Sequence, residues 1–306
     1  MSAAVSIIMA TYNREKYILE SLQSIQNQTY TNFECLIIDD GGTDNTAEII
    51  SDLLLQDDRF TYRLRPAIYQ KGLPGCRNFG LDIAKGDYII FFDDDDIVHP
   101  QNLELCLGHL QQNNAFCIYN KIAFYNDFNI NFDNDLQYQT RIIDVNNLLS
   151  IIKNEIAISS CSVMWTKSCF VSSRFVESLQ YAEEWELYPR IITNGFCGIF
   201  IDKSLYFARK HTNSNTGEFY NNDPIRRKSK KDAILLVIEN LKQKNLLSNS
   251  ILKYFISMSF DYKEFKLFSK IISLANLSFL QKVQWHIYKL SFPFRLPLYK
   301  FKKRYT

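Results

Sequence analysis

The sequence of 306 residues contains no apolar run that approaches the roughly 18 residues of a membrane-spanning helix. Its first residues carry no cationic leader ahead of an apolar stretch, so we expect a cytoplasmic protein rather than a secreted one. The seven cysteines are scattered and never form a C-x-x-C pair. This pattern disfavours a zinc site or a disulfide framework and predicts reduced thiols in the core.

Acidic residues are absent after Glu264, whereas nine lysines and arginines follow it. The net charge of +2 for the whole chain therefore leaves −7 for residues 1–264. Aromatic and basic side chains interleave through Leu280–Tyr305, a mixture that suits the headgroup region of an anionic membrane better than a nucleic acid. Basic helices folded against the rest of the chain are the alternative.

Short apolar runs alternate with helical patterns over the first part of the chain. The runs that predict strands are 5–9, 33–38, 60–64 and 88–92, and the segments that predict helices are 17–25, 44–55, 75–84 and 100–113. Such alternation predicts an α/β fold in which a mostly parallel sheet is covered by helices on both faces.

The pattern is less regular after residue 116. Residues 126–135 are rich in Asn and Asp and predict a loop, whereas 161–165 and 205–208 predict strands and 182–194 a helix. From about Pro224 the chain becomes helical and basic. We therefore expect a domain of residues 1–215 and a helical C-terminal region of residues 216–306.

Polar side chains follow three of the predicted strands at the points where the strands end. These clusters are Ala10-Thr11-Tyr12-Asn13, Asp39-Asp40-Gly41-Gly42 and Asp93-Asp94-Asp95-Asp96. Because ligands of such sheets bind beyond the carboxyl ends of the strands, we expect the three clusters to converge on one rim.

The four consecutive aspartates would repel one another strongly at the end of a buried strand. Like charges in that position raise one another's pKa and oppose folding unless a cation or a donor network compensates. Carboxylate oxygens are the ligands that hard ions prefer. The run therefore predicts a site for Mg²⁺ or Mn²⁺.

Within residues 5–211, four motifs occur in a specific order between Ser6 and Asp96. They are Ser6-Ile7-Ile8-Met9-Ala10-Thr11-Tyr12-Asn13, Ile37-Ile38-Asp39-Asp40-Gly41-Gly42-Thr43-Asp44, Gly75-Cys76-Arg77-Asn78-Phe79-Gly80 and Gly86-Asp87-Tyr88-Ile89-Ile90-Phe91-Phe92-Asp93-Asp94-Asp95-Asp96. This set resembles the family 2 glycosyltransferases. The resemblance implies the Rossmann-like GT-A fold, with a mostly parallel mixed sheet. It also implies a nucleotide-diphosphate sugar as donor, inversion at the anomeric carbon and a divalent metal.

The resemblance places the nucleotide at the first three motifs. Asp40 would accept a hydrogen bond from the base, which suits the imide N–H of uracil, while an Asp-Gly turn is the other explanation of Asp39 and Asp40. Ala10, Thr11 and Tyr12 would support the same base. Arg77 would contact the nucleotide or its diphosphate near a helix N-terminus, unless it is a solvated arginine on a helix face.

The resemblance also assigns the metal and the general base. A D-x-D pattern selects Asp93 and Asp95, whereas an adjacent pair selects Asp94 and Asp95, so Asp95 is the predicted metal ligand. Asp93 or Asp94 would then contact the ribose or the metal through water. His211 would add a metal or phosphate contact, or would be a surface histidine.

Tyr181-Ala182-Glu183-Glu184-Trp185-Glu186-Leu187 resembles the E-D-W-D-L element of this family, in which the second acidic residue is the base. Glu184 occupies that position and Glu183 is the competitor. Trp185 would form a platform for the acceptor sugar or belong to the core.

We therefore expect an inverting, metal-assisted glycosyltransferase that moves a sugar, from UDP in preference to other carriers, to a hydroxyl of a glycan or lipid-linked acceptor during synthesis of a bacterial surface polysaccharide. Such an enzyme would be cytoplasmic or peripheral on the inner face of the cell membrane. The alternative is a non-catalytic module that binds nucleotide sugars or nucleic acid through its basic tail.

Overall fold

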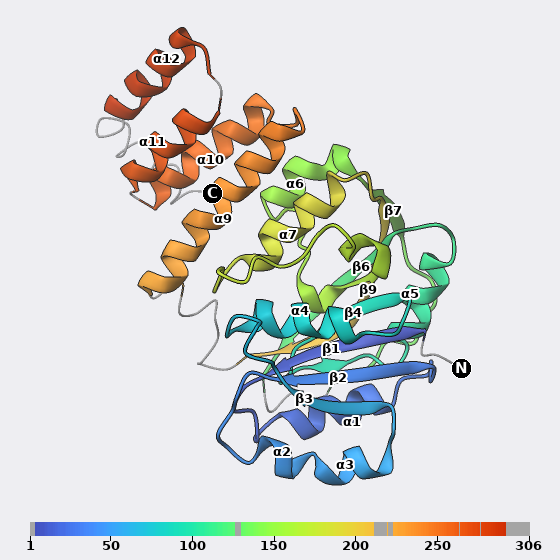
Figure 1. Ribbon diagram of the computed structural model, residues 1–306. Helices are drawn as coiled ribbons and strands as arrows, with labels where there is room; N and C mark the ends of the chain where they lie inside the picture. The colour runs from blue at the N-terminus through green and yellow to red at the C-terminus, as the bar shows by residue number, and fades with distance from the viewer. Residues whose placement is uncertain are drawn as a thin grey trace. The chain divides into compact units, whose positions relative to one another are not determined.

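The structure is a computed structural model that describes residues 4–125, 130–210, 219, 223–262, 264–275 and 277–291 (Figure 1). The chain separates into two compact units, Met1–Ala233 and Ile234–Thr306. This division lies within one helix, α9 (Pro224–Gln243). The boundary that the sequence predicts after residue 215 stays a prediction, because it falls among residues that the structure leaves undescribed.

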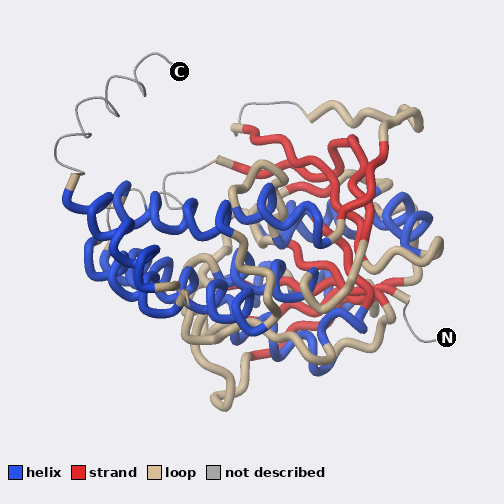
Figure 2. The backbone as a smooth tube through the Cα atoms, turned by 90° about the horizontal axis from the view of Figure 1, so that it is seen from above, coloured by secondary structure: helices blue, strands red, loops and turns tan. Residues whose placement is uncertain are grey.

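One mixed sheet forms the centre of the first unit (Figures 1 and 2). Four of its strands are parallel neighbours in the order β3-β2-β1-β4, with bounds β3 (Phe60–Leu64), β2 (Phe33–Asp39), β1 (Val5–Thr11) and β4 (Tyr88–Phe92). On the other side of β4 the sheet continues with β8 (Val163–Thr166), which pairs antiparallel with β4. The strands after β8 are β6 (Phe116–Phe124), β9 (Gly198–Arg209) and β5 (Ile97–Val98), and β7 (Thr140–Ile143) also pairs with β9.

Helices cover both faces of this sheet, as the sequence predicts. All seven residues of β1 are buried, and their side chains alternate between two cores. Ile7 and Met9 pack with α1 (Ile18–Gln26) and α5 (Asn102–Leu110), whereas Ile8 and Ala10 pack with α4 (Leu73–Ile83) and α7 (Glu183–Ile192). Figure 1 shows α1 and α4 on opposite sides of β1. The expected α/β fold is confirmed.

Helix α4 lies very close to β1 because of a glycine. A Cβ atom at Gly80 would lie 2.4 Å from Cγ2 of Ile8, closer than two carbon atoms can approach. This contact fixes the position of α4, which carries Arg77, against the sheet.

The helix predicted over residues 44–55 is divided into α2 (Thr46–Ile49) and α3 (Ser51–Gln56). Asp44 lies just before α2. Its carboxylate accepts hydrogen bonds from the N–H of Thr46 at 3.1 Å and the N–H of Glu15 at 3.0 Å, so it joins this segment to the loop after β1.

The second unit contains the end of α9 and the helices α10 (Asn249–Asp261), α11 (Phe265–Leu274) and α12 (Phe279–Leu290). Serine caps begin two of them: the hydroxyls of Ser248 and Ser278 accept from the N–H groups of Ile251 and Gln281. The expected C-terminal helical extension is therefore present. Within the described residues, no helix has both the length and the apolar character needed to cross a bilayer.

Candidate active site

The three polar clusters meet at one edge of the sheet, as the sequence predicts. Thr11 at the end of β1 pairs with Asp39 at the end of β2, and Met9 pairs with Phe92 at the end of β4. Since the three strands are parallel neighbours, the residues that follow them emerge side by side.

A pocket of about 250 Å³ opens beside this edge. Its lining includes five residues that the sequence assigns to nucleotide-sugar binding: Ala10, Thr11, Tyr12, Asp40 and Asp94. Arg14, Cys76, Glu183 and Arg226 also line it, together with the segment Gly72–Pro74 that begins α4. The pocket is therefore surrounded by carboxylates and guanidinium groups.

Asp39 and Asp40 have different surroundings. Asp39 is buried, and its Oδ1 accepts from the N–H groups of Gly41 at 3.0 Å and Gly42 at 2.9 Å, while its Oδ2 accepts from the hydroxyl of Tyr62. Asp39 thus holds the turn after β2. Asp40 lines the pocket instead, where Arg65 Nε donates to its Oδ1 at 2.5 Å.

Arg14 neutralises part of the aspartate run. Its Nε donates to Oδ1 of Asp94 at 2.8 Å, and its Nη2 lies 3.6 Å from Oδ2 of Asp95. Asp96 accepts from the N–H of Arg209 at 2.7 Å. Asp93 is the most open of the four, with a side chain that is 38% exposed, whereas the other three residues are buried.

These partners do not fully compensate the burial of the aspartates. Burial and the nearby charge of Asp95 raise the pKa of Asp94 to about 7, although the positive charge of Arg14 acts in the opposite direction. Burial, together with the charges of Asp93 and Asp95, raises the pKa of Asp96 to about 8. The pKa of Asp93 is also raised, chiefly by burial. The run therefore still favours a further cation.

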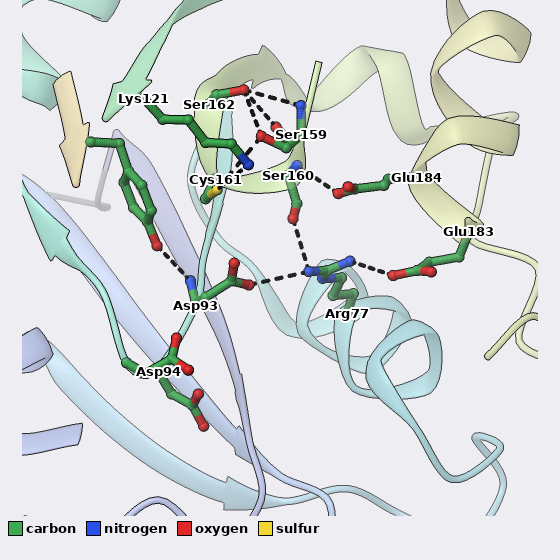
Figure 3. Close-up of polar contacts among 12 residues, drawn as sticks. Arg77, Asp93, Asp94, Lys121, Ser159, Ser160, Cys161, Ser162, Glu183 and Glu184 are labelled. Atoms are coloured by element: carbon green, nitrogen blue, oxygen red, sulfur yellow. Dashed lines mark hydrogen bonds and ion pairs between the residues drawn. The ribbon is translucent and has the colours of Figure 1, made fainter. Parts of the chain in front are cut away.

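Arg77 is buried in a network that links α4, β4 and α7 (Figure 3). Its guanidinium lies 3.1 Å from Glu183 Oε1 and 3.4 Å from Asp93 Oδ1, and it donates to the hydroxyl of Ser160 at 2.9 Å. Burial opposes its charge, but Glu183 and Asp93 outweigh this effect and raise the pKa of Arg77. The alternative of a solvated arginine is wrong. Arg77 does not line the pocket described above, and its guanidinium contacts Glu183, Asp93 and Ser160 instead.

The two candidate bases begin α7 and point to different partners (Figure 3). Glu183 is buried and paired with Arg77. Glu184 is half-buried, and its Oε2 accepts from the N–H of Ser160 at 2.6 Å. The positions of both follow from Ala182, which adopts a left-handed conformation (φ 64°) immediately before the helix.

Trp185 has a structural contact on its edge and a charged contact on its face. Its Nε1 donates to the carbonyl of Ile152 at 3.0 Å, and Lys230 Nζ lies 3.4 Å from the centre of the ring. The ring is half-buried, so both expected roles of Trp185 stay open.

One group of side chains within the described residues has the spacing of a metal site. A ligand atom from each of Asp93, Asp96 and Cys161 lies within 4.8 Å of the others. The two carboxylates fit a hard divalent ion, because burial and mutual repulsion raise their pKa values and a bound cation would relieve both effects. The thiol fits poorly, since burial raises its pKa far above neutral.

Four residues that complete this site were not predicted from the sequence. Arg14, Lys121, Ser160 and Arg226 come from separate parts of the chain, and Lys121 Nζ lies 4.0 Å from Cys161 Sγ beside the metal group. Only Arg14, one residue beyond the first polar cluster, stood near a motif. His211 lies outside the described residues, so its predicted role is untested.

The fold and the site together have the form of a GT-A sugar-nucleotide domain, and the comparisons with known proteins agree. The sequence profile described as glycosyl transferase family 2 matches residues 6–170, which is more than half of the chain. The chain therefore belongs to glycosyltransferase family 2.

Two curated relatives illustrate how much of the chain is shared. An uncharacterised glycosyltransferase of Haemophilus influenzae is 39% identical over 120 residues, which cover 39% of this chain and 47% of that protein. WfgD of Escherichia coli, named UDP-Glc:alpha-D-GlcNAc-diphosphoundecaprenol beta-1,3-glucosyltransferase, is 38% identical over 126 residues, or 41% of this chain and 48% of WfgD. The chain thus matches less than half of the length of either relative.

A solved structure extends the similarity of fold beyond the family profile. S. aureus TarS 1-349 in complex with UDP-GlcNAc has a TM-score of 0.66 and 18% sequence identity, over 88% of this chain and 79% of TarS. This likeness supports the GT-A fold.

Proposed function

We propose that the chain is an inverting glycosyltransferase that moves a sugar from UDP to a hydroxyl of a lipid-linked acceptor in the synthesis of a bacterial surface polysaccharide. One observation carries this proposal: a single pocket at the carboxyl ends of β1, β2 and β4 is lined by Asp40, Asp94 and Glu183. Family membership supports a sugar-nucleotide donor. The name of the relative WfgD, which includes UDP-Glc and diphosphoundecaprenol, supports UDP as the carrier and a lipid-linked acceptor.

The nucleotide would occupy this pocket. Asp40, already paired with Arg65, would accept the imide N–H of the base, and the ring of Tyr12, which is 47% exposed, would stack on it. Thr11 also lines the pocket, and its hydroxyl interacts with Asp94. Arg14 and Arg226 would lie near the phosphates.

Asp95 and Asp93 would hold Mn²⁺ or Mg²⁺. Asp93 is favoured over Asp94 as the partner of Asp95, since Asp93 is the most exposed of the four and belongs to the group with metal-site spacing. Asp95 does not belong to that group, so its place as a ligand rests on the family resemblance. A bound divalent ion would stabilise the charge on the departing diphosphate. His211 stays a predicted further ligand.

Glu184 would act as the general base. In a single displacement the acceptor oxygen bonds to the anomeric carbon, the bond from that carbon to the diphosphate oxygen breaks, and the acceptor proton passes to Glu184. Ser160 orients the carboxylate of Glu184 through its N–H. Glu183 is less suited to the task because it neutralises the buried Arg77. Arg77 thereby becomes a positioning residue, although the sequence suggested a nucleotide contact.

Substitution of the two glutamates tests this assignment. Turnover would be followed as UDP release from a panel of UDP-sugars with Mn²⁺ and undecaprenyl-diphosphate-linked acceptors. Glu184→Gln should lower turnover by about 100-fold to 10,000-fold, because the amide cannot take a proton, while affinity for UDP and the melting temperature stay unchanged.

Glu183→Gln is the matched control. It should lower the melting temperature, because it weakens the pairing of buried Arg77. Normal turnover by Glu184→Gln would overturn the assignment of the base. UDP binding without transfer by the unaltered chain, across the whole panel, would favour a binding module instead of an enzyme.

A further inference from the structure

Helix α12 exposes a set of large apolar side chains. Besides Tyr288 (36%), five of its twelve residues are apolar and exposed: Phe279 (78%), Leu280 (73%), Val283 (39%), Ile287 (60%) and Leu290 (74%). None of the residues of α12 is buried. Folding of the second unit therefore does not account for these side chains.

The five side chains share one face of the helix. At 3.6 residues per turn they fall within an arc of about 100°. Their spacing forms a continuous apolar stripe along the helix. We call this set the α12 stripe.

Side chains outside the α12 stripe attach the helix to its own unit. The ring of Tyr288 lies 5.6 Å from that of Phe260, the ring of His286 lies 5.7 Å from that of Phe268, and Lys289 Nζ lies 5.3 Å from the same ring of Phe268. These contacts fix the rotation of the helix about its axis. The α12 stripe consequently faces away from α10 and α11.

The charged residues that follow Glu264 in the sequence are all positive. Lys282 is exposed on α12, and Lys266 and Lys270 are exposed on α11. Lys289 instead packs on the ring of Phe268. Five further lysines and arginines follow in residues 295–304, which lie outside the described residues. An exposed apolar stripe in a segment whose charges are all positive complements an anionic lipid surface.

We propose that the α12 stripe binds the surface of a bilayer that contains anionic lipids. The apolar side chains enter the boundary between headgroups and acyl chains, and the lysines pair with lipid phosphates. A second copy of the chain fits less well, because association through this face would bring like-charged lysines together. A nucleic acid would attract the lysines but offers little to five aliphatic and aromatic side chains. Membrane attachment would act independently of the transfer reaction.

Co-sedimentation of the full chain with vesicles tests the proposal without any substrate. Binding is expected to vesicles of phosphatidylcholine with phosphatidylglycerol, and to fall as salt is raised. Vesicles of phosphatidylcholine alone should bind at least about tenfold less. Ile287→Ser with Leu290→Ser should weaken binding to the anionic vesicles by about tenfold or more, because it removes two inserted side chains.

The matched control is Leu55→Ser with Ile68→Ser, which removes two exposed apolar side chains (85% and 87% exposed) from the first unit. This control should bind vesicles as the unaltered chain does, and both variants should keep its melting temperature. Equal vesicle binding by the Ile287→Ser, Leu290→Ser variant and the unaltered chain would overturn the proposal. Loss of a dimer in that variant would instead identify a second copy as the partner. Binding to an oligonucleotide that exceeds binding to anionic vesicles would identify a nucleic acid.

Discussion

The two units of this protein depart from ordinary burial in opposite ways. The first unit buries charge: Arg77, Asp94, Asp95, Asp96 and Glu183 are all nearly inaccessible. Within its described residues the second unit buries no charged side chain, yet it exposes the α12 stripe. Each arrangement costs free energy in the isolated chain. The comparison teaches that buried charge and exposed apolar surface each indicate the kind of partner that would offset their free-energy cost. For the buried charge of the first unit this partner is a cation with a nucleotide, and for the α12 stripe it is a lipid surface.

The largest effect on stability is expected from the buried charge at the centre of the first unit. Arg77→Met should lower the free energy of unfolding by about 3–5 kcal/mol, because it leaves Glu183 and Asp93 without their common cation. Urea denaturation measures the change. The exposed Arg63→Met is the control and should change little. A loss below about 1 kcal/mol for Arg77→Met would mean that the charged network does not stabilise the unit.

A substitution in the aspartate run should lower turnover and metal binding without unfolding the protein. Asp95→Asn should lower turnover by about 100-fold or more and abolish the rise in melting temperature caused by Mn²⁺, because it removes a metal ligand. Asp87→Asn, at the opposite end of β4 and exposed, should preserve both properties. An unchanged response of Asp95→Asn to Mn²⁺ would exclude Asp95 from the metal site.

The raised pKa values predict a smaller effect that depends on pH. Asp94 and Asp96 titrate in the folded protein at about 7 and about 8, chiefly because they are buried, but near 4 when unfolded. Without a cation, their contribution to stability is therefore fully present below about pH 4 and is lost as the pH rises towards 8. Mn²⁺ should increase the free energy of unfolding more at pH 8 than at pH 6, by on the order of 1 kcal/mol per group, and this difference is measured as a larger rise in melting temperature at pH 8. A larger rise at pH 6 would contradict this titration.

The smallest effect is expected from the α12 stripe. Ile287→Ser should change the free energy of unfolding by less than about 0.5 kcal/mol, because the side chain is already in water. Phe268→Ala, in the buried core of the same unit, should lower it by about 3–5 kcal/mol. Urea denaturation of both variants compares them. A large loss for Ile287→Ser would show that the stripe packs within its own unit, and the contrast between the two units would fail.

Much of the first half of the fold follows from local patterns. The buried strands β1, β2 and β4 coincide with apolar runs, and the polar clusters follow them directly. By contrast, the long strand β6 was missed. Residues 120–123, just before its buried last residue Phe124, are not buried, so no continuous apolar run marks its full length. Strand pairing with β8 and β9, which are distant in the sequence, makes it part of the sheet.

The same limit applies to the candidate site. The sequence placed Asp40, Asp94 and Glu184 near one another through motifs, but it offered no partner for Arg77. The actual partners, Glu183 and Ser160, are 106 and 83 residues away. Helical periodicity also left the direction of the α12 stripe open, because an amphipathic pattern shows that one face is apolar without showing what that face contacts.

By itself the sequence determined the alternation of strands and helices, the cluster of carboxylates at the strand ends and the excess of positive charge after Glu264, because each depends on residue type and short spacing. Only the tertiary structure decided between neighbours of the same chemistry. Asp39 holds a turn while Asp40 lines the pocket, and Glu183 neutralises Arg77 while Glu184 bonds to Ser160. Adjacent carboxylates are equivalent in a sequence pattern. They become different once distant elements supply a donor to one and a cation to the other.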